Sequence, residues 1–214
     1  MELLDVKISH YVEAHISPES DLLKKINRDT HAFVMRPRML SGHLQGRLLS
    51  FISHMVAPRT ILEIGTYTGY SALCLAEGLA PGGKLITLDI NEELEQRVRN
   101  YFREAGMEQT IDYRIGNALT LIPQLDLPLD LVFIDADKEN YSSYFDLVID
   151  KVPTGGYILA DNVLWSGQIL DERPDKDTRA IIDFNAKIQN DPRVDNILLP
   201  VRDGIMVMRK IREH

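Results

Sequence analysis

The sequence predicts an α/β fold built around a mostly parallel sheet with helices on both faces. From residue 60 onward, short apolar runs alternate with stretches of helical spacing, and this alternation requires crossover connections between parallel strands. Near the end, Asp203-Gly204 separates two apolar runs, which is typical of a hairpin, so we expect the sheet to finish with an antiparallel pair. With 214 residues, 44% hydrophobic and 26% charged, the chain fits one large globular domain.

Residues 1–56 are predicted to form a helical segment of that domain, which continues as residues 57–214. Ser17 followed by Pro18 predicts a helix start, and Leu22, Leu23 and Ile26 then repeat at helical spacing. A second apolar stripe stops before Pro58 and consists of Leu44, Leu48, Leu49, Ile52 and Met55.

The alternating region that follows contains strands and helices in turn. The expected parallel strands are Thr60–Ile64, Lys84–Asp89, Ile111–Ile115, Leu129–Ile134 and Tyr157–Asp161. The expected helices are Tyr70–Ala80, Glu92–Ala105, Ala118–Leu125, Tyr141–Lys151 and Thr178–Asn190. Asn91 is the expected N-cap of the second of these helices, and Gly106 is its expected stop. The closing hairpin pairs Val194–Pro200 with Ile205–Lys210 through Arg202-Asp203-Gly204.

Charge and cysteine content exclude several classes of protein. The net charge of −8 (24 basic against 32 acidic residues) disfavours binding to nucleic acid or anionic membranes through overall charge. The single cysteine, Cys74, excludes an internal disulfide and suits a reducing, cytoplasmic location; its place in a predicted helix indicates a buried, inert thiol. No apolar run approaches ~18 residues, so we expect no membrane span.

The turn after the first predicted strand carries the first functional signal. It reads Glu63-Ile64-Gly65-Thr66-Tyr67-Thr68-Gly69-Tyr70-Ser71, and glycines at this place let a ligand approach the backbone beyond the carboxyl end of a parallel strand. The glycine spacing matches neither the G-x-G-x-x-G dinucleotide motif nor a phosphate-binding loop. A tight turn without a ligand is the alternative.

Asp89 closes the second predicted strand, where an acidic side chain can accept hydrogen bonds from both hydroxyls of a ribose. An aspartate placed just before Asn91 also suits a helix-capping turn. Together with the first loop, Asp89 favours a cofactor that contains a nucleoside but needs no phosphate cradle, such as S-adenosylmethionine.

The ends of two later strands suggest a metal site. Asp135 follows the fourth strand, and Asp161-Asn162 end the fifth, so parallel pairing would bring them to one edge of the sheet. Two carboxylates and an amide oxygen suit Mg²⁺ or another divalent cation such as Mn²⁺ or Ca²⁺. Taken singly, each aspartate would more commonly be a loop or capping residue.

Lys138, Trp165 and the histidines are the remaining candidates for a functional role. Lys138, three residues after Asp135, either overhangs the same cation, where desolvation favours a neutral base, or is an ordinary solvated lysine. Trp165 is either a packing residue or a stacking wall for a flat substrate. The histidines contain no close ligand pair; they are His10, His15, His31, His43, His54 and His214.

Three ordered segments make the chain similar to the cation-dependent class I O-methyltransferases, which include caffeoyl-coenzyme A and catechol O-methyltransferases and their bacterial relatives. The segments are the Glu63–Ser71 loop, Phe133-Ile134-Asp135-Ala136-Asp137-Lys138 and Ala160-Asp161-Asn162-Val163-Leu164-Trp165. The similarity extends from about residue 40 to the C-terminus and includes Leu199–Gly204. It implies a Rossmann-like, seven-stranded methyltransferase sheet with an antiparallel last strand, and it makes residues 57–214 the S-adenosylmethionine-dependent methyltransferase domain.

The resemblance also implies roles for individual residues. The implied cofactor contacts are Ser41, Glu63, Gly65, Tyr67, Ser71, Asp89, Asn117, Ala118 and Asp135. The implied metal ligands are Asp135, Asp161 and Asn162; the catalytic residues are Lys138 and Asp135; the substrate contacts are Lys138, Asn162 and Trp165. Animal catechol methyltransferases carry an acidic residue six positions before the final Asp-Gly, whereas this chain has Ile197, so an animal-type catechol pocket is not expected.

The predicted function is divalent-metal-dependent transfer of a methyl group from S-adenosylmethionine to a hydroxyl of a catechol-like, hydroxylated aromatic small molecule. One alternative is a tRNA hydroxyuridine O-methyltransferase, with a basic patch formed by Arg36, Arg38, Arg47 and Arg59. The alternative from another class is a non-catalytic S-adenosylmethionine-binding protein, which the metal-ligand set and Lys138 disfavour.

A homodimer is expected, because the family commonly forms dimers. Several apolar residues of the N-terminal segment either form part of a self-complementary surface or pack on their own sheet; they are Leu22, Leu23, Ile26, Phe33 and Met35.

Overall fold

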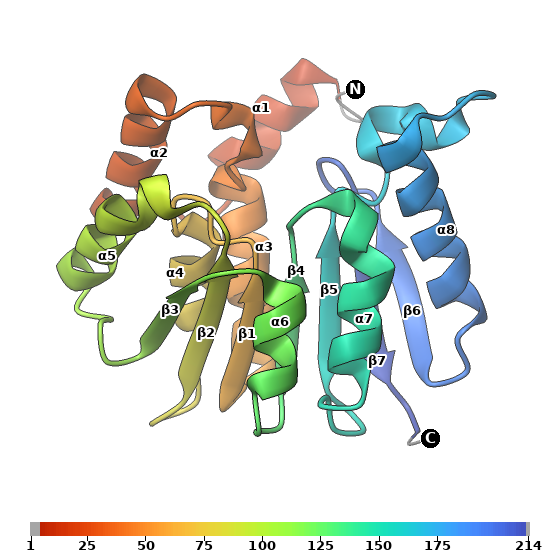
Figure 1. Ribbon diagram of the computed structural model, residues 1–214. Helices are drawn as coiled ribbons and strands as arrows, with labels where there is room; N and C mark the ends of the chain where they lie inside the picture. The colour runs from red at the N-terminus through yellow and green to blue at the C-terminus, as the bar shows by residue number, and fades with distance from the viewer. Residues whose placement is uncertain (1–4, 213–214) are drawn as a thin grey trace. The chain divides into compact units, whose positions relative to one another are not determined.

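The computed structural model describes residues 5–212, and Figure 1 shows its ribbon. Within this range, seven strands form a mixed sheet in the order β3-β2-β1-β4-β5-β7-β6. The strands are β1 (Thr60–Ile64), β2 (Lys84–Asp89), β3 (Ile111–Ile115), β4 (Leu131–Ile134), β5 (Tyr157–Asp161), β6 (Val194–Leu199) and β7 (Ile205–Lys210). The predicted α/β fold with an antiparallel end is confirmed, and β4 begins two residues later than predicted.

The described chain divides into two compact units, one formed by residues 6–117 and the other mainly by residues 118–212. The division follows Asn117, so the predicted N-terminal helical segment shares a unit with β1, β2 and β3.

In residues 6–117, β2 pairs in parallel with both β1 and β3. The α-helices of this unit are α1 (Val6–Ala14), α2 (Asp21–Phe33), α3 (Gly42–Val56), α4 (Tyr70–Ala76) and α5 (Glu95–Glu104), with short 3-10 helices at Pro37–Met39 and Glu92–Leu94. Helix α4 packs against α3 and against β1 and β2, and α5 packs against β3. These contacts bury the apolar strand residues and leave the carboxyl ends of β1 and β2 to carry loops.

The start of α2 corrects the sequence prediction. The N-cap is Ser20, whose side chain accepts a hydrogen bond from the Leu23 amide at 3.2 Å, so the predicted cap Ser17 and Pro18 lie before the helix. The Ser17 carbonyl instead accepts a hydrogen bond from His43 Nε2 at 2.8 Å. A start at Ser20 satisfies a free helix amide and still places Leu23 and Ile26 in the core.

The apolar stripe predicted for α3 is only partly right. Leu49 and Ile52 are buried, but Met55 is 75% exposed. The rest of the buried face is small or polar: Gln45, Gly46, Ser50 and Ser53. The reason is close helix packing, since a Cβ on Gly46 would lie 2.6 Å from Cε1 of Tyr70 in α4.

The predicted capping residues of the 92–105 helix are confirmed. Asn91 accepts a hydrogen bond from the Glu93 amide at 3.0 Å, and Gly106 has a φ of +68° directly after the helix. The helical span itself begins as the 3-10 turn and becomes α-helical at Glu95. Helix α4 ends at Ala76 rather than Ala80, and Gly78 there approaches α3 so closely that a Cβ would lie 2.3 Å from the His54 amide nitrogen.

In residues 118–212, β5 pairs in parallel with β4 and antiparallel with β7, and β7 pairs antiparallel with β6. The helices are α6 (Ala118–Leu121), α7 (Tyr141–Ile149) and α8 (Lys176–Asn190), with 3-10 segments at Ile122–Gln124, Lys138–Asn140 and Trp165–Leu170. Helices α7 and α8 pack together (Figure 1), with the rings of Tyr141 and Phe184 5.4 Å apart edge to face. The predicted hairpin is confirmed: the Gly204 amide donates to the Val201 carbonyl at 3.0 Å, and Arg202 and Gly204 have φ values of +51° and +84°.

Among the described residues, no helix combines the length and apolar character that crossing a bilayer would require.

Candidate active site

The loop after β1 has a tightly turned backbone. Gly65, Tyr67 and Gly69 have φ values of +103°, +48° and +80°, and the Gly65 amide donates to the Leu88 carbonyl of β2 at 2.8 Å. A Cβ on Gly69 would lie 2.8 Å from Cε1 of Phe102, so glycine is required there for both conformation and space. The backbone of this loop is therefore fixed at the carboxyl end of β1 by its glycines and by its hydrogen bond to β2.

Glu63 lies fully buried at the base of this loop. Its carboxylate accepts hydrogen bonds from Ser71 Oγ at 2.6 Å and Thr87 Oγ1 at 2.5 Å, and the Thr66 and Thr87 hydroxyls are 2.6 Å apart. These two hydroxyl groups thus supply hydrogen bonds to the Glu63 carboxylate, which would be costly to bury without them. Glu63 and Ser71, both implied cofactor contacts, therefore hold the end of β1 to the start of α4.

Asp89 holds the same loop from the end of β2. Its Oδ2 accepts hydrogen bonds from the amides of Thr66 and Tyr67 at 3.0 and 2.6 Å, and its Oδ1 accepts one from the Asn91 amide at 2.8 Å. The structure thus contains the capping turn that the sequence suggested as an alternative role for Asp89. It does not exclude a ribose, because each carboxylate oxygen has further acceptor capacity.

Other implied cofactor residues lie in or directly after the 6–117 unit. The Tyr67 hydroxyl donates to the Met35 carbonyl at 3.0 Å, which ties the loop to the segment before α3. Ser41 is buried at the start of α3. Asn117 is exposed after Gly116, whose amide donates to the Asp89 carbonyl at 2.8 Å. Ala118, the last implied contact, is buried at the start of α6.

In the 118–212 unit, the residues after β4 and β5 meet around Lys138. Its Nζ donates to Asp135 Oδ1 at 3.2 Å and Asn162 Oδ1 at 2.7 Å, and the residue is only 9% exposed. The solvated-lysine alternative is therefore wrong. Asp161 is 3% exposed and accepts a hydrogen bond from the Asn162 amide at 2.8 Å. All four predicted polar groups thus belong to one cluster at this edge.

Tyr141 is a member of this cluster that the sequence analysis missed. Its hydroxyl accepts a hydrogen bond from Lys138 Nζ at 2.6 Å and donates to the Asp161 carbonyl at 3.0 Å. Burial, with the nearby carboxylates of Asp135 and Asp161, holds the pKa of Tyr141 well above its usual value, so its proton stays in place. The sequence signal for Tyr141 was its position three residues after Lys138, because residues three apart lie on the same face of a helix.

Burial and the repulsion of Asp161 raise the pKa of Asp135, although Lys138 opposes the shift. A cation bound between Asp135 and Asp161 would stabilise these two desolvated carboxylates in their charged form. Within residues 5–212, no group of three His, Cys, Asp or Glu side chains is placed to hold a metal ion. A divalent cation here would need the Asn162 oxygen beside the two carboxylates, with its remaining positions taken by water or substrate. This hard, all-oxygen donor set fits Mg²⁺.

Trp165 follows this cluster in an irregular segment. Its ring centroid lies 5.8 Å from Lys138 Nζ, and its side chain is half-buried, so the indole faces the cluster and is not a core residue. Ile197 lies on β6 and is 57% exposed.

Several other residues have structural contacts instead. Cys74 is fully buried, as predicted, and burial raises the pKa of its thiol to about 12. Arg47 forms a two-pronged ion pair with Glu77 at 2.8 and 2.7 Å, which removes it from the proposed basic patch. The rings of four histidines contact backbone carbonyls (His15, His31, His43 and His54), and His214 lies outside the described residues.

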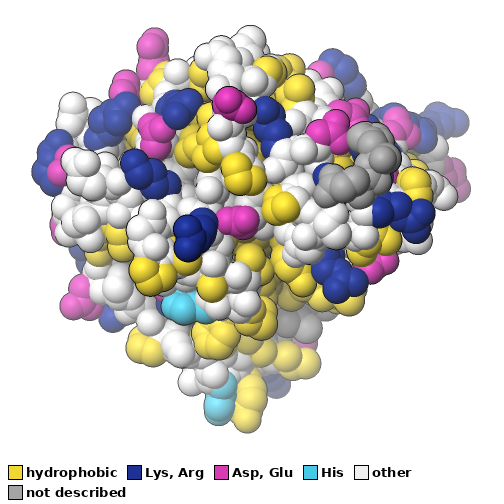
Figure 2. Space-filling view, turned by 90° about the horizontal axis from the view of Figure 1, so that it is seen from below, with side chains coloured by type: hydrophobic (Ala, Val, Ile, Leu, Met, Phe, Trp, Pro, Cys, Tyr) yellow, Lys and Arg dark blue, Asp and Glu magenta, His cyan; other side chains and the backbone are white. Residues whose placement is uncertain are grey.

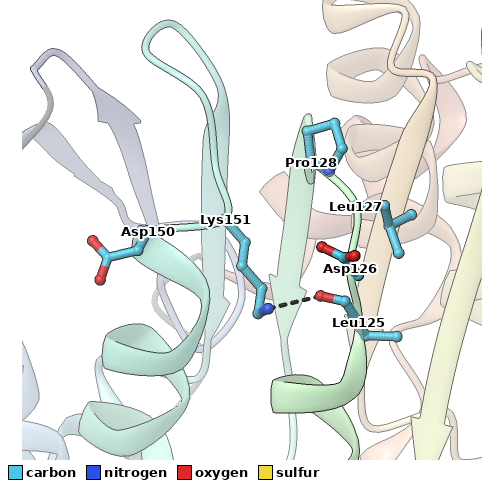
Figure 3. Close-up of a pocket in the computed structure, with 6 residues that line it drawn as sticks. All are labelled: Leu125, Asp126, Leu127, Pro128, Asp150 and Lys151. Carbon is cyan, nitrogen blue, oxygen red and sulfur yellow. Dashed lines mark hydrogen bonds between the residues drawn. The ribbon is translucent and has the colours of Figure 1, made fainter.

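A surface hollow of about 340 Å³ lies in the 118–212 unit, but not at the cluster (Figure 3). Its lining comes from Leu125–Pro128, before β4, and from Asp150 and Lys151, after α7. Lys151 Nζ donates to the Leu125 carbonyl there at 2.7 Å. The hollow is therefore at the amino end of β4, whereas Asp135 follows its carboxyl end.

Comparison with known proteins agrees with this arrangement. The profile of a family described as O-methyltransferase matches residues 12–211. Caffeoyl-CoA O-methyltransferases from Medicago sativa and Mesembryanthemum crystallinum are 31% and 34% identical; the alignments cover 97% of this chain and 90% and 87% of theirs. Among solved structures, an O-methyltransferase from Bacillus cereus in complex with SAH has a TM-score of 0.87 at 30% identity, covering 95% of this chain and 97% of that one.

A second solved structure, an SAH-bound methyltransferase from Podospora anserina, has a TM-score of 0.89 at 29% identity, covering 96% of this chain and 94% of that one. The family match spans nearly the whole chain, and the structural neighbours hold the demethylated cofactor. The chain therefore belongs to the class I S-adenosylmethionine-dependent O-methyltransferase family and is an O-methyltransferase.

Proposed function

We propose that this enzyme methylates one hydroxyl of a catechol-like aromatic small molecule with the help of a divalent cation. The observation that carries the proposal is the cluster after β4 and β5, in which Asp135, Asp161 and Asn162 present hard oxygens beside a buried lysine. When bound, a divalent cation would hold two neighbouring acceptor oxygens and make the hydroxyl more acidic, and S-adenosylmethionine would supply the methyl group.

Lys138 is the proposed general base. Its Nζ donates three hydrogen bonds, to Asp135, Asn162 and the Tyr141 hydroxyl. To accept a proton, the neutral amine must turn its lone pair toward the acceptor hydroxyl and give up one of these contacts. The Asp135 bond is the longest of the three, at 3.2 Å, so we expect Lys138 to exchange that one. The Tyr141 hydroxyl stays protonated, donates its hydrogen bond to the Asp161 carbonyl, and accepts the hydrogen bond that holds Lys138 Nζ in place.

The cofactor is proposed to bind at the edge formed by β1, β2 and β3. Asp89 would accept the ribose hydroxyls in addition to the loop amides, while Gly65 and Tyr67 would line the methionine side. Glu63 and Ser71 would act through the buried hydrogen bond that holds this loop. The other proposed cofactor contacts are Ser41, Asn117, Ala118 and Asp135, with Asn117 and Ala118 against the adenine. Trp165 would form a stacking wall for the aromatic acceptor.

The two alternative functions predict different results: methylated tRNA for the first, and cofactor binding without any methylated product for the second. A tRNA substrate has less support, because Arg47 is paired with Glu77. On the face seen from below in Figure 2, Lys and Arg side chains are interspersed with Asp and Glu, so that face presents no uniformly basic surface. A non-catalytic binding protein would have no need for a buried lysine among metal-type oxygens.

The test is a product assay by mass spectrometry with catechol, caffeoyl-coenzyme A and undermethylated tRNA, each with Mg²⁺ or with EDTA. The expected result is a singly methylated catechol-type product in Mg²⁺ and none in EDTA. Methylation of tRNA alone would favour the first alternative. Cofactor binding without any methylated product would favour the second. An Asp126→Ala variant, altered at the hollow in Figure 3, is the matched control and should keep wild-type activity.

A cytoplasmic homodimer is proposed as the working form. Two of the apolar residues predicted for the dimer interface, Leu23 and Ile26, are buried in the chain's own core and cannot contact a second copy. Phe33 and Met35 are 72% and 85% exposed, and such large apolar side chains favour contact with a second copy. Light scattering at micromolar concentration should give twice the chain mass, and a monomer mass would contradict the proposal.

A further inference from the structure

The loop that follows β5 is held in a strained backbone conformation. Asn162, Trp165 and Ser166 have φ values of +58°, +45° and +53°. Asparagine tolerates this left-handed region, but tryptophan and serine enter it at a cost. Such residues persist only where the surroundings fix them. Some contact outside the loop must therefore hold it.

The β6–β7 hairpin turn provides that contact. The amides of Val163 and Leu164 donate to the carbonyls of Gly204 and Asp203 at 3.2 and 2.9 Å. The Ser166 amide donates to the Asp203 carboxylate at 2.5 Å. Asp203 thus binds the residue before Trp165 with its backbone and the residue after it with its side chain.

The close approach of the turn depends on its glycine. A Cβ on Gly204 would lie 2.5 Å from Leu164 Cγ, so the turn and the loop are packed in van der Waals contact. On the other side of the loop, Asn185 of α8 donates to the Val163 carbonyl at 2.8 Å. The Asp203 carboxylate is the charged member of this set, and hydrogen bonds to a charged group are the stronger ones.

The held loop carries two groups of the cluster. Asn162, at its start, accepts the Lys138 hydrogen bond at 2.7 Å, and the Trp165 ring centroid lies 5.8 Å from the same nitrogen. A backbone rotation at any of these three left-handed residues would move the Asn162 side chain or the Trp165 ring. We propose that Asp203 is a positioning residue: its carboxylate clamps the Asn162–Ser166 loop and so fixes the Asn162 oxygen and the Trp165 ring toward Lys138. The link to catalysis rests on the proposed function, whereas the clamp itself does not.

The structure offers a direct probe of the clamp, because Trp165 is the single tryptophan of the chain. Its fluorescence can be measured on the full protein with neither cofactor nor substrate added. Loss of a hydrogen bond to a charged group should shift the loop equilibrium roughly tenfold or more. Asp203→Ala should therefore raise acrylamide quenching of Trp165 and lower the steady-state anisotropy. Asp203→Asn, which keeps an acceptor oxygen but loses the charge, should give quenching between that of wild type and that of Asp203→Ala. Asp126→Ala should be indistinguishable from wild type.

Kinetics then test the positioning role. Asp203→Ala should lower kcat by about tenfold or more, while the Kd for S-adenosylmethionine changes less than about twofold. Adding Ser166→Gly to Asp203→Ala should recover part of the lost rate, because glycine adopts the left-handed conformation without the clamp. Unchanged Trp165 quenching in a folded Asp203→Ala variant would overturn the proposal. This fluorescence result decides the clamp even if no acceptor is methylated, so its failure is distinct from failure of the proposed function.

Discussion

Replacement of Lys138 by methionine tests both the stability of the cluster and the proposed chemistry. Lys138 Nζ donates hydrogen bonds at 2.6, 2.7 and 3.2 Å to Tyr141, Asn162 and Asp135. Methionine has a similar length but no donor, so three acceptors lose a partner. Each buried unsatisfied polar group costs roughly 1–3 kcal/mol, and water can offset part of this at Asp135, whose side chain is 18% exposed. We expect the free energy of unfolding to fall by about 2–4 kcal/mol.

The effect on turnover should be larger. General-base catalysis contributes ~10²–10⁴-fold, so Lys138→Met should lower kcat by that factor and leave the affinity for S-adenosylmethionine nearly unchanged. Lys138→Arg separates the two effects: it keeps a positive donor and hence much of the stability, but a guanidinium cannot accept the proton and should not restore activity. Raising the pH should partly rescue Lys138→Met, because the acceptor hydroxyl then ionises without a base.

The assay is initial-rate kinetics on the best acceptor of the substrate screen, combined with urea denaturation. Lys151→Met is the matched control, since Lys151 is also part-buried and donates one hydrogen bond, to the Leu125 carbonyl, at the other end of β4. It should lose ~1 kcal/mol of stability and no activity. A Lys138→Met enzyme within about twofold of the wild-type kcat would refute the assignment of Lys138 as the base.

Three further predictions concern the metal, the cofactor and pH. Asp161→Ala should abolish turnover, as EDTA should for the wild type, while calorimetry still detects S-adenosylmethionine binding; full activity in EDTA would reject metal dependence. Asp89→Ala removes the acceptor of three loop amides and should weaken S-adenosylmethionine binding roughly tenfold or more, so an unchanged Kd in calorimetry would place the ribose elsewhere. Desolvation, with Asp161, raises the pKa of Asp135 to about 7, above the ~3.9 of an unfolded chain. Its contribution to stability is therefore fully present below pH ~4 and lost as the pH rises through about 7. In EDTA, urea denaturation should show a steeper fall in unfolding free energy between these values for the wild type than for Asp135→Asn, and parallel pH profiles would contradict this account.

The contacts of Asp89 show how one residue can support both interpretations of its position. Its carboxylate accepts the amides of Thr66 and Tyr67 in the first loop and of Asn91 in the next turn. These bonds shape the edge before any ligand arrives, so a mutation at Asp89 acts on loop geometry as well as on the cofactor. Comparing Asp89→Asn with Asp89→Ala separates the two, because asparagine keeps one acceptor oxygen.

Local sequence signals determined most of the fold. Apolar runs bounded by polar and glycine residues located β1, β2, β3, β5 and β7 with their observed limits. Asn91, Gly106 and Asp203-Gly204 marked a cap, a helix stop and a turn, because capping and left-handed conformations depend on the residue itself. The order of strand ends along the chain was likewise enough to predict that Asp135, Asp161 and Asn162 share one edge of the sheet.

Contacts between distant residues decided the rest. Ser17, the predicted cap of α2, lies before the helix and its carbonyl accepts a hydrogen bond from His43, 26 residues away. Close packing against Tyr70 turned a partly polar face of α3 inward. The burial of Lys138 and its bond to Asn162 join residues 24 apart in sequence, and the Asp203 clamp on Ser166 joins residues 37 apart. No local periodicity encodes such pairs, because their energies depend on which surfaces the sheet brings together. The sequence by itself therefore predicted four polar groups of the cluster, Asp135, Lys138, Asp161 and Asn162. Only the tertiary structure added Tyr141 and decided that these groups and the Trp165 loop are held in one arrangement.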